Sequence, residues 1–199
     1  MIKNIIFDMG NVLLAYTPHE FIKTVTDDGE AAQAILKELF YGREWLQLDE
    51  GSITEESAVE SVSLRLPHYS DLIRKAMDNW HSDLTPIDGM PEIVKKLKSK
   101  NYGIYLLSNT SIKFFSYKDD VDMFRDFDGF IISAREKKLK PNREIYECIC
   151  ERFGLSPGEC LFIDDLQPNI TGALEAGLNA HLFQGAGELA GYLEENNIL

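Results

Sequence analysis

Short apolar runs separated by amphipathic segments dominate the hydrophobic pattern of this chain. Four runs are bounded by polar or turn residues, as is typical of strands buried on both faces, and a weaker fifth run follows. They are Ile2–Phe7, Tyr102–Leu107, Phe127–Ile132, Cys160–Ile163 and Ala180–Phe183. Amphipathic segments that begin at Pro91, Pro141 and Pro168 predict helices, the last two ending before Gly154 and Gly177. Strands alternating with such helices predict a doubly wound parallel sheet of the α/β class.

The stretch from residue 16 to residue 86 interrupts this alternation. Apolar residues recur there with helical spacing, as at Ala31, Ile35 and Leu39, and no strand pattern is present. Ser52 and Glu55 have the spacing of a capping box, which marks a helix start. We therefore expect an all-helical cap at 16–86, inserted into an α/β core formed by 1–15 and 87–199.

Composition limits the class of protein. The chain has 199 residues and a formal charge of −13, a size suited to one domain with an insertion and a charge that disfavours binding to nucleic acid. Its three cysteines are too few and odd in number for a disulfide framework, and no 18 apolar residues run together. We expect a cytoplasmic protein, a monomer or homodimer, with no membrane or nucleic-acid partner.

Polar residues follow three of the apolar runs directly. Asp8 ends the first run, Ser108 and Asn109 follow the second, and Asp164 and Asp165 follow the fourth. Ligands of open α/β sheets bind beyond the carboxyl ends of the strands, so these side chains are expected to converge. Three converging carboxylates repel one another unless a cation compensates, and an all-oxygen ligand set favours Mg²⁺.

Lys140 adds a cation to this set. It precedes Pro141, and the residue before a proline favours extended backbone, so we expect its side chain to project from a loop at a helix N-terminus. A lysine together with the hydroxyl and amide of Ser108 and Asn109 can satisfy phosphate oxygens. The whole set predicts transfer of a phosphoryl group from a small phosphorylated metabolite to an aspartate nucleophile.

Four motifs in this order resemble those of the haloacid dehalogenase superfamily, in its class with a helical cap after the first motif. They are Phe7-Asp8-Met9-Gly10-Asn11-Val12, Leu107-Ser108-Asn109, Lys140-Pro141 with Tyr146 following, and Phe162-Ile163-Asp164-Asp165 with Asn169. The resemblance covers nearly the whole chain. It implies a Mg²⁺-dependent phosphoric monoester hydrolase.

The resemblance also implies a role for each site residue. Asp8 would be the nucleophile and would bind Mg²⁺ through one oxygen, while Lys140 would bridge Asp8 and the phosphate. The remaining implied roles are metal binding by the Gly10 carbonyl, by Asp165 directly and by Asp164 directly or through water, phosphate binding by Ser108 and Asn109, and support of the ligands by Asn169. Arg43, Trp45 and Gln47 fall where caps of this class often contact substrate.

Gly10 departs from the usual pattern of the family. Most phosphatases that it resembles have an aspartate there, two residues after the nucleophile, which protonates the leaving group. The Asp-x-Gly-Asn-Val opening resembles a subgroup that includes bacterial sugar-phosphate phosphatases. Without that acid we expect the rate to depend steeply on leaving-group pKa, unless His19 or a residue of the cap supplies the proton.

Three other functions fit parts of the pattern. Hydrolytic dehalogenation needs no acid at Gly10, but it uses no metal, so it leaves the Asp164-Asp165 pair unexplained. A phosphoacceptor signalling domain also combines aspartates, Mg²⁺, a hydroxyl residue and a lysine, but its acidic pair comes before the acceptor rather than after it. A catalytically degenerate protein that binds phosphate without turnover is the last alternative, and Gly10 is its only support.

Overall fold

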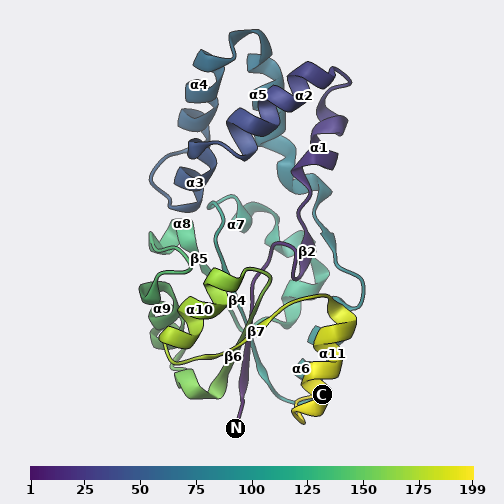
Figure 1. Ribbon diagram of the computed structural model, residues 1–199, viewed down its shortest axis with the longest axis vertical. Helices are drawn as coiled ribbons and strands as arrows, with labels where there is room; N and C mark the ends of the chain where they lie inside the picture. Colours follow the sequence, from purple (N-terminus) through teal and green to yellow (C-terminus); the bar gives the residue numbers. More distant parts are fainter.

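A computed structural model describes residues 1–199 and places a five-stranded sheet at the centre of the larger part of the molecule (Figure 1). Every neighbouring pair in this sheet is parallel, in the order β5-β4-β1-β6-β7. The strands are β1 (Asn4–Phe7), β4 (Gly103–Ser108), β5 (Gly129–Ile132), β6 (Cys160–Asp164) and β7 (Asn179–Leu182). The α/β fold and all five strands predicted from the apolar runs are therefore confirmed, with ends shifted by one or two residues.

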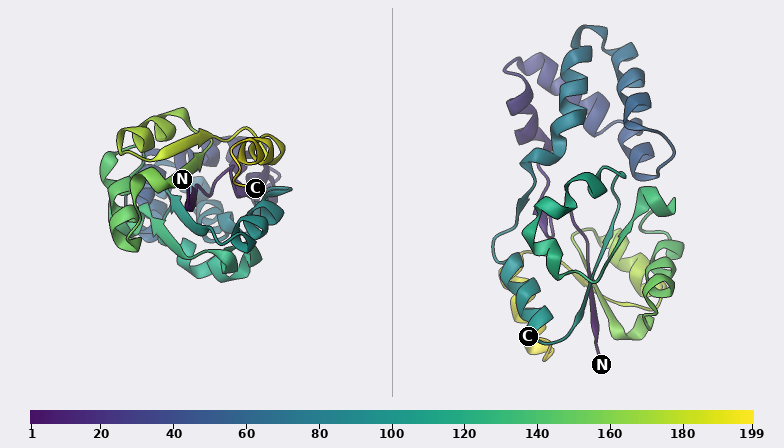
Figure 2. Two further views of the ribbon diagram at one scale, coloured as in Figure 1. Left: turned by 90° about the horizontal axis from the view of Figure 1, so that it is seen from below. Right: turned by 180° about the vertical axis from the view of Figure 1, so that it is seen from behind.

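Helices cover both faces of the sheet, so the core has three layers (Figure 2). Successive side chains of a strand point to opposite faces. Ile5 and Phe7 accordingly belong to one hydrophobic cluster with α6 (Met90–Ser99) and α11 (Ala186–Glu195). Ile6 belongs to a second cluster with α9 (Arg143–Phe153) and α10 (Gln167–Glu175). The short helices α7 (Phe114–Tyr117) and α8 (Ser133–Glu136) follow β4 and β5, with 3₁₀ turns at Lys118–Asp120, Asp122–Asp126 and Pro157–Glu159.

The prolines mark the helix starts only approximately. Pro168 lies in the first turn of α10, as predicted, and Gly154 follows α9 in a left-handed conformation. The helix predicted to begin at Pro141 begins at Arg143 instead. Asn142 still has extended backbone, with ψ of 137°, so Pro141 belongs to the loop that carries Lys140.

Residues 18–83 contain only helices, and we call them the helical insertion. It lies beyond the carboxyl ends of the strands, at the opposite end of the molecule from the N-terminus (Figure 1). Its elements are α1 (Pro18–Val25), α2 (Gly29–Ile35), a π-helical turn (Leu36–Phe40), α3 (Arg43–Asp49), α4 (Glu55–Arg65), α5 (Ser70–Asn79) and 3₁₀ turns at Pro67–Tyr69 and Trp80–Asp83. The helical content agrees with a cap, while the limits 16 and 86 stay a prediction.

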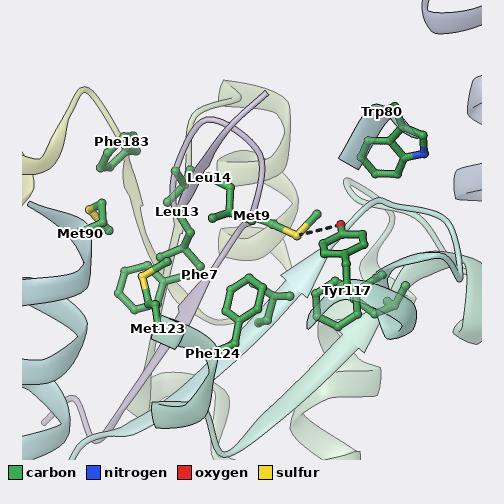
Figure 3. Packing of buried hydrophobic residues seen from close by; sticks show 14 of the residues in the cluster. Phe7, Met9, Leu13, Leu14, Trp80, Met90, Tyr117, Met123, Phe124 and Phe183 are labelled. Atoms are coloured by element: carbon green, nitrogen blue, oxygen red, sulfur yellow. Dashed lines mark hydrogen bonds between the residues drawn. The ribbon is translucent and has the colours of Figure 1, made fainter. Parts of the chain in front are cut away.

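Two short antiparallel strands, β2 (Leu14–Ala15) and β3 (Thr85–Pro86), connect the insertion to the core. The sequence pattern did not reveal them, because two-residue strands carry no periodicity. The larger hydrophobic cluster continues from the sheet through this connection, where Met9, Leu14 and Trp80 are buried (Figure 3). The insertion and the core therefore share one continuous apolar interior.

The capping box predicted at Ser52 and Glu55 is wrong in its capping residue. A helix does begin at Glu55, but its N-cap is Thr54, whose hydroxyl accepts a hydrogen bond from the Ser57 amide at 3.2 Å. The Ser52 hydroxyl donates instead to the Gln47 carbonyl at 3.1 Å, so Ser52 belongs to the turn after α3. No helix in the structure is both long and apolar enough to cross a membrane.

Candidate active site

The polar strand ends converge because β4, β1 and β6 are neighbours in a parallel sheet. Asp8 follows β1, Ser108 ends β4 and Asp164 ends β6, so all three lie at the same edge. A cavity of about 240 Å³ opens there, between the sheet and the helical insertion. Its lining includes the predicted residues Asp8, Gly10, Ser108, Asn109, Lys140, Asp165 and Asn169.

Lys140 lies between two carboxylates. Its Nζ is 2.7 Å from Asp8 Oδ1 and 2.7 Å from Asp164 Oδ2, and its side chain is only 1% exposed. The lysine leaves a loop near the start of α9, as predicted, and its side chain is buried. The two ion pairs compensate for the loss of its hydration.

Asn109 holds the backbone of Lys140 with both ends of its amide. Asn109 Nδ2 donates to the Lys140 carbonyl at 3.0 Å, and the Lys140 amide donates to Asn109 Oδ1 at 2.9 Å. These bonds join the loop after β4 to the loop before α9. Asn109 therefore positions the backbone of Lys140. Its binding of phosphate remains a prediction.

Asp164 accepts hydrogen bonds at both carboxylate oxygens. The Leu166 amide donates to Oδ1 at 2.8 Å, and Asn169 Nδ2 lies 3.0 Å from each oxygen. The Tyr146 hydroxyl in turn donates to the Asn169 carbonyl at 2.8 Å. Asn169 therefore supports the Asp164 carboxylate directly. Asp164 is fully buried and is paired with the Lys140 ammonium.

Asp8, Asp164 and Asp165 can place one oxygen each within 4.8 Å of one another. Lys140 is the cation paired with Asp8 and Asp164 in this group, and three carboxylates against one ammonium leave an excess of two negative charges. Burial and the neighbouring Asp164 carboxylate raise the pKa of Asp165. This charge excess and the all-oxygen donors fit a divalent hard cation.

Burial dominates the electrostatics of Asp8. It raises the pKa of the Asp8 carboxyl to about 6, with Lys140 opposing the shift and Asp164 adding to it. Burial alone would lower the pKa of the Lys140 ammonium, but the carboxylates of Asp8 and Asp164 together raise it. The lysine therefore stays charged, whereas burial destabilises the anionic form of Asp8 even beside this lysine.

The opposite wall of the cavity is largely apolar and comes mostly from the insertion and its connections. Tyr16, Trp45, Trp80 and Leu84 line it. The rings of Trp45 and Trp80 meet edge to face with centroids 5.3 Å apart, and Tyr16 lies within 6.3 Å of both. Such a wall suits a ligand with an apolar face.

Asp49 is a cavity residue that the sequence interpretation missed. It ends α3, and its neighbour Gly51 turns back with φ of +68°, where a Cβ would lie 2.1 Å from the Ala134 carbonyl oxygen. The Ser133 hydroxyl donates to the Asp49 carbonyl at 2.6 Å. These contacts fix the end of α3 against α8, so that Asp49 lines the cavity. Gly51 was the only local signal of this close approach.

Three residues considered from the sequence lie away from the cavity. His19 is exposed on α1 with Nε2 3.4 Å from Glu20, so it does not enter the cleft. Of the three positions expected to contact substrate, Trp45 lines the cavity, whereas Arg43 and Gln47 do not.

The backbone conformation at position 10 does not require a glycine. Its φ lies outside the left-handed region, and a Cβ added there would meet only Tyr16 Cβ at 4.0 Å. The missing side chain therefore leaves open space rather than serving a tight turn.

The family of haloacid dehalogenase-like hydrolases matches residues 2–177. The chain belongs to this family. It is 26% identical over 155 residues to flavin mononucleotide hydrolase 1 of Arabidopsis thaliana, covering 77% of this chain and 62% of that protein. It is 32% identical over 133 residues to enolase-phosphatase E1 of Persephonella marina, covering 65% and 49%. The chain thus spans about half to three-fifths of the length of these curated relatives.

Solved structures share the whole fold. A haloacid dehalogenase family enzyme from Bacteroides thetaiotaomicron, in complex with magnesium and inorganic phosphate, is 26% identical with a TM-score of 0.71, covering 93% of this chain and 96% of that one. A dehalogenase structure has a TM-score of 0.74 at 21% identity, covering 96% and 97%, which shows a common fold.

Proposed function

We propose that this protein is a Mg²⁺-dependent phosphatase that hydrolyses a small phosphorylated metabolite through an aspartyl-phosphate at Asp8. The observation that carries the proposal is the excess of two negative charges where Asp8, Asp164 and Asp165 meet around Lys140. A substrate phosphate is itself anionic, so this edge can accept it only with a further cation. The phosphatase relatives and the magnesium and phosphate in the Bacteroides enzyme support the same choice.

Asp8, Asp165 and the Gly10 carbonyl would hold the Mg²⁺, with Asp164 completing the site directly or through water. Because hydrogen bonds already engage both Asp164 oxygens, we favour the water-mediated contact. Bound Mg²⁺ neutralises charge on the phosphate oxygens. Ser108 and Lys140 hold the remaining phosphate oxygens, and Asn109 contributes its second amide hydrogen.

The reaction has two displacements. Asp8 attacks phosphorus, the bond to the leaving oxygen breaks, and that oxygen takes a proton to leave as an alcohol. Water then attacks the phosphorus of the aspartyl-phosphate and gives up a proton to the group that supplied the first one, which releases phosphate and restores both Asp8 and that group. The cavity of about 240 Å³ limits the substrate to a small metabolite, of which a sugar phosphate is one class.

The test is phosphate release from an array of phosphorylated metabolites, with Mg²⁺ and with chelator, by the wild type and by Asp8→Asn. We expect Mg²⁺-dependent turnover in the wild type and less than about a hundredth of it in Asp8→Asn, the scale set by loss of one catalytic group. Turnover that survives this substitution would exclude Asp8 as the nucleophile.

Hydrolytic dehalogenation is the second candidate. Gly10 favours it, since a halide leaves without a proton, and (S)-2-haloacid dehalogenase 4A of Burkholderia cepacia is 25% identical over 130 residues. Chloride release from 2-chloropropionate, independent of Mg²⁺ and without any phosphatase activity, would select this function instead.

A further inference from the structure

The cavity has two unlike halves, and the phosphate site occupies one of them. The cation and polar donors that suit a phosphate, Lys140 and Ser108, lie at the edge of the sheet. The leaving group must therefore extend into the other half, toward the aromatic wall. The ionisable carboxyl in that half is Asp49, carried by the helical insertion.

The Asp49 carboxyl has no partner within the protein. Its backbone carbonyl accepts from Ser133, but no hydrogen bond or ion pair engages its side chain. Asp49 is partly buried, and a carboxyl that lines a cavity without a partner is less stable as an anion than one in water, which favours a proton or a ligand at this position. Asp49 is therefore unlike Asp8 and Asp164, which are paired with Lys140.

The other ionisable groups of the cavity are poor proton donors to a leaving group. Asp8 is the nucleophile, Lys140 is enclosed by its two carboxylates, and Asp165 belongs to the proposed metal site. Burial raises the pKa of the Tyr16 phenol far above its usual value, so its conjugate base is too costly to form near neutral pH.

We propose that Asp49 protonates the leaving-group oxygen and thereby replaces the acid that Gly10 cannot supply. This inference rests on the proposed function. As the bond from phosphorus to the leaving oxygen breaks, that oxygen takes the Asp49 proton and departs as an alcohol, while the phosphoryl group passes to Asp8. The Asp49 carboxylate then takes a proton from the attacking water, so both groups return to their starting states.

The electrostatic surroundings agree with this role. Burial raises the pKa of Asp49 to about 7, and the neighbouring Asp8 carboxylate adds to the shift while Lys140 opposes it. The Glu50 carboxylate, next in the chain, makes the smallest contribution to the shift, and Asp49 in turn raises the pKa of Tyr16 and of Tyr117. A carboxyl that titrates near neutral pH can both give and take a proton during turnover.

The test compares substrates that need a proton with substrates that do not. In Asp49→Asn, we expect kcat/KM for glycerol phosphate to fall by roughly 10²- to 10⁴-fold, the usual contribution of a general acid. For 2,4-dinitrophenyl phosphate, whose leaving group is stable as an anion, we expect less than about a tenfold change. The neighbouring variant Glu50→Gln should match the wild type on both, since Glu50 does not line the cavity.

A series of aryl and alkyl phosphates gives a second measurement. We expect a shallow dependence of kcat/KM on leaving-group pKa in the wild type and a steep one in Asp49→Asn. Equal losses on both substrate classes, or a steep dependence already in the wild type, would overturn the role of Asp49. Asparagine is nearly isosteric with aspartate, and thermal unfolding checks that the variant keeps its fold.

The outcomes separate this inference from the proposed function. A wild type that hydrolyses phosphate esters through Asp8, together with an Asp49→Asn variant of unchanged selectivity, overturns the inference alone. A wild type that releases phosphate from none of the substrates overturns both.

Discussion

The core and the helical insertion each hold one cation between two carboxylates. In the core, Lys140 lies between Asp8 and Asp164, with side-chain exposures of 1%, 11% and 0%. In the insertion, Arg65 lies between Glu38 and Glu44, with exposures of 41%, 28% and 8%. The charges are the same in number and sign, but their surroundings differ.

The pKa values of Asp8 and Glu44 shift in opposite directions. Burial raises the pKa of Asp8 to about 6, despite its lysine partner. Hydrogen bonds from Arg65 instead lower the pKa of Glu44 to about 2, against a smaller effect of burial. Arg65 reaches Glu44 with two bonds, of 2.7 and 2.9 Å, and remains partly hydrated. Asp8 and Glu44 are similarly enclosed, so the difference comes from the cation: buried Lys140 is shared between two carboxylates, whereas the partly exposed Arg65 donates two hydrogen bonds to Glu44.

Removal of the cation from each cluster gives the largest expected contrast. Lys140→Met leaves two buried carboxylates uncompensated, so we expect a loss of roughly 3–5 kcal/mol in the free energy of unfolding and loss of phosphatase activity. Arg65→Met is the matched control, expected to lose about 1 kcal/mol because the pair is partly exposed and screened, with activity retained. Denaturant unfolding in the presence of chelator measures both, and equal losses would contradict the comparison.

Addition of Mg²⁺ should distinguish the two clusters, because Asp165 adds a third carboxylate beside the core cluster and the insertion cluster has no equivalent of it. At a concentration near 100 times its dissociation constant, we expect Mg²⁺ to stabilise the wild type by about 2.7 kcal/mol. Asp165→Ala should lose most of this gain, whereas Glu38→Gln in the insertion should keep it. The measurement is the rise in melting temperature with added Mg²⁺, and equal rises in the first two proteins would place the metal elsewhere.

The smallest expected effect is the pH dependence of the insertion cluster. The pKa of Glu44 is lower in the folded state, so its contribution is complete above the unfolded value near 4.5 and disappears as pH falls toward 2. Glu44→Gln should therefore lose about 1 kcal/mol at pH 7, and less by pH 3, without any change in turnover. An unchanged deficit at pH 3, measured by denaturant unfolding, would contradict the assigned pKa.

Much of the core site could be predicted because it depends on short-range patterns. The apolar runs located the strands, and parallel pairing brings their carboxyl ends to one edge, so Asp8, Ser108 and Asp164 had to meet there. The start of α9 and the capping residue of α4 were less predictable. Several polar residues near each end can satisfy the same backbone groups, and tertiary contacts select among them.

By itself, the sequence determined the α/β alternation, the helical insertion after the first strand and the group of carboxylates at the sheet edge. Only the tertiary structure decided that Lys140 is buried between Asp8 and Asp164. It also decided that Asp49 faces the same cavity. That placement depends on the close approach of Gly51 to Ala134, a contact between residues far apart in the chain that no local periodicity encodes.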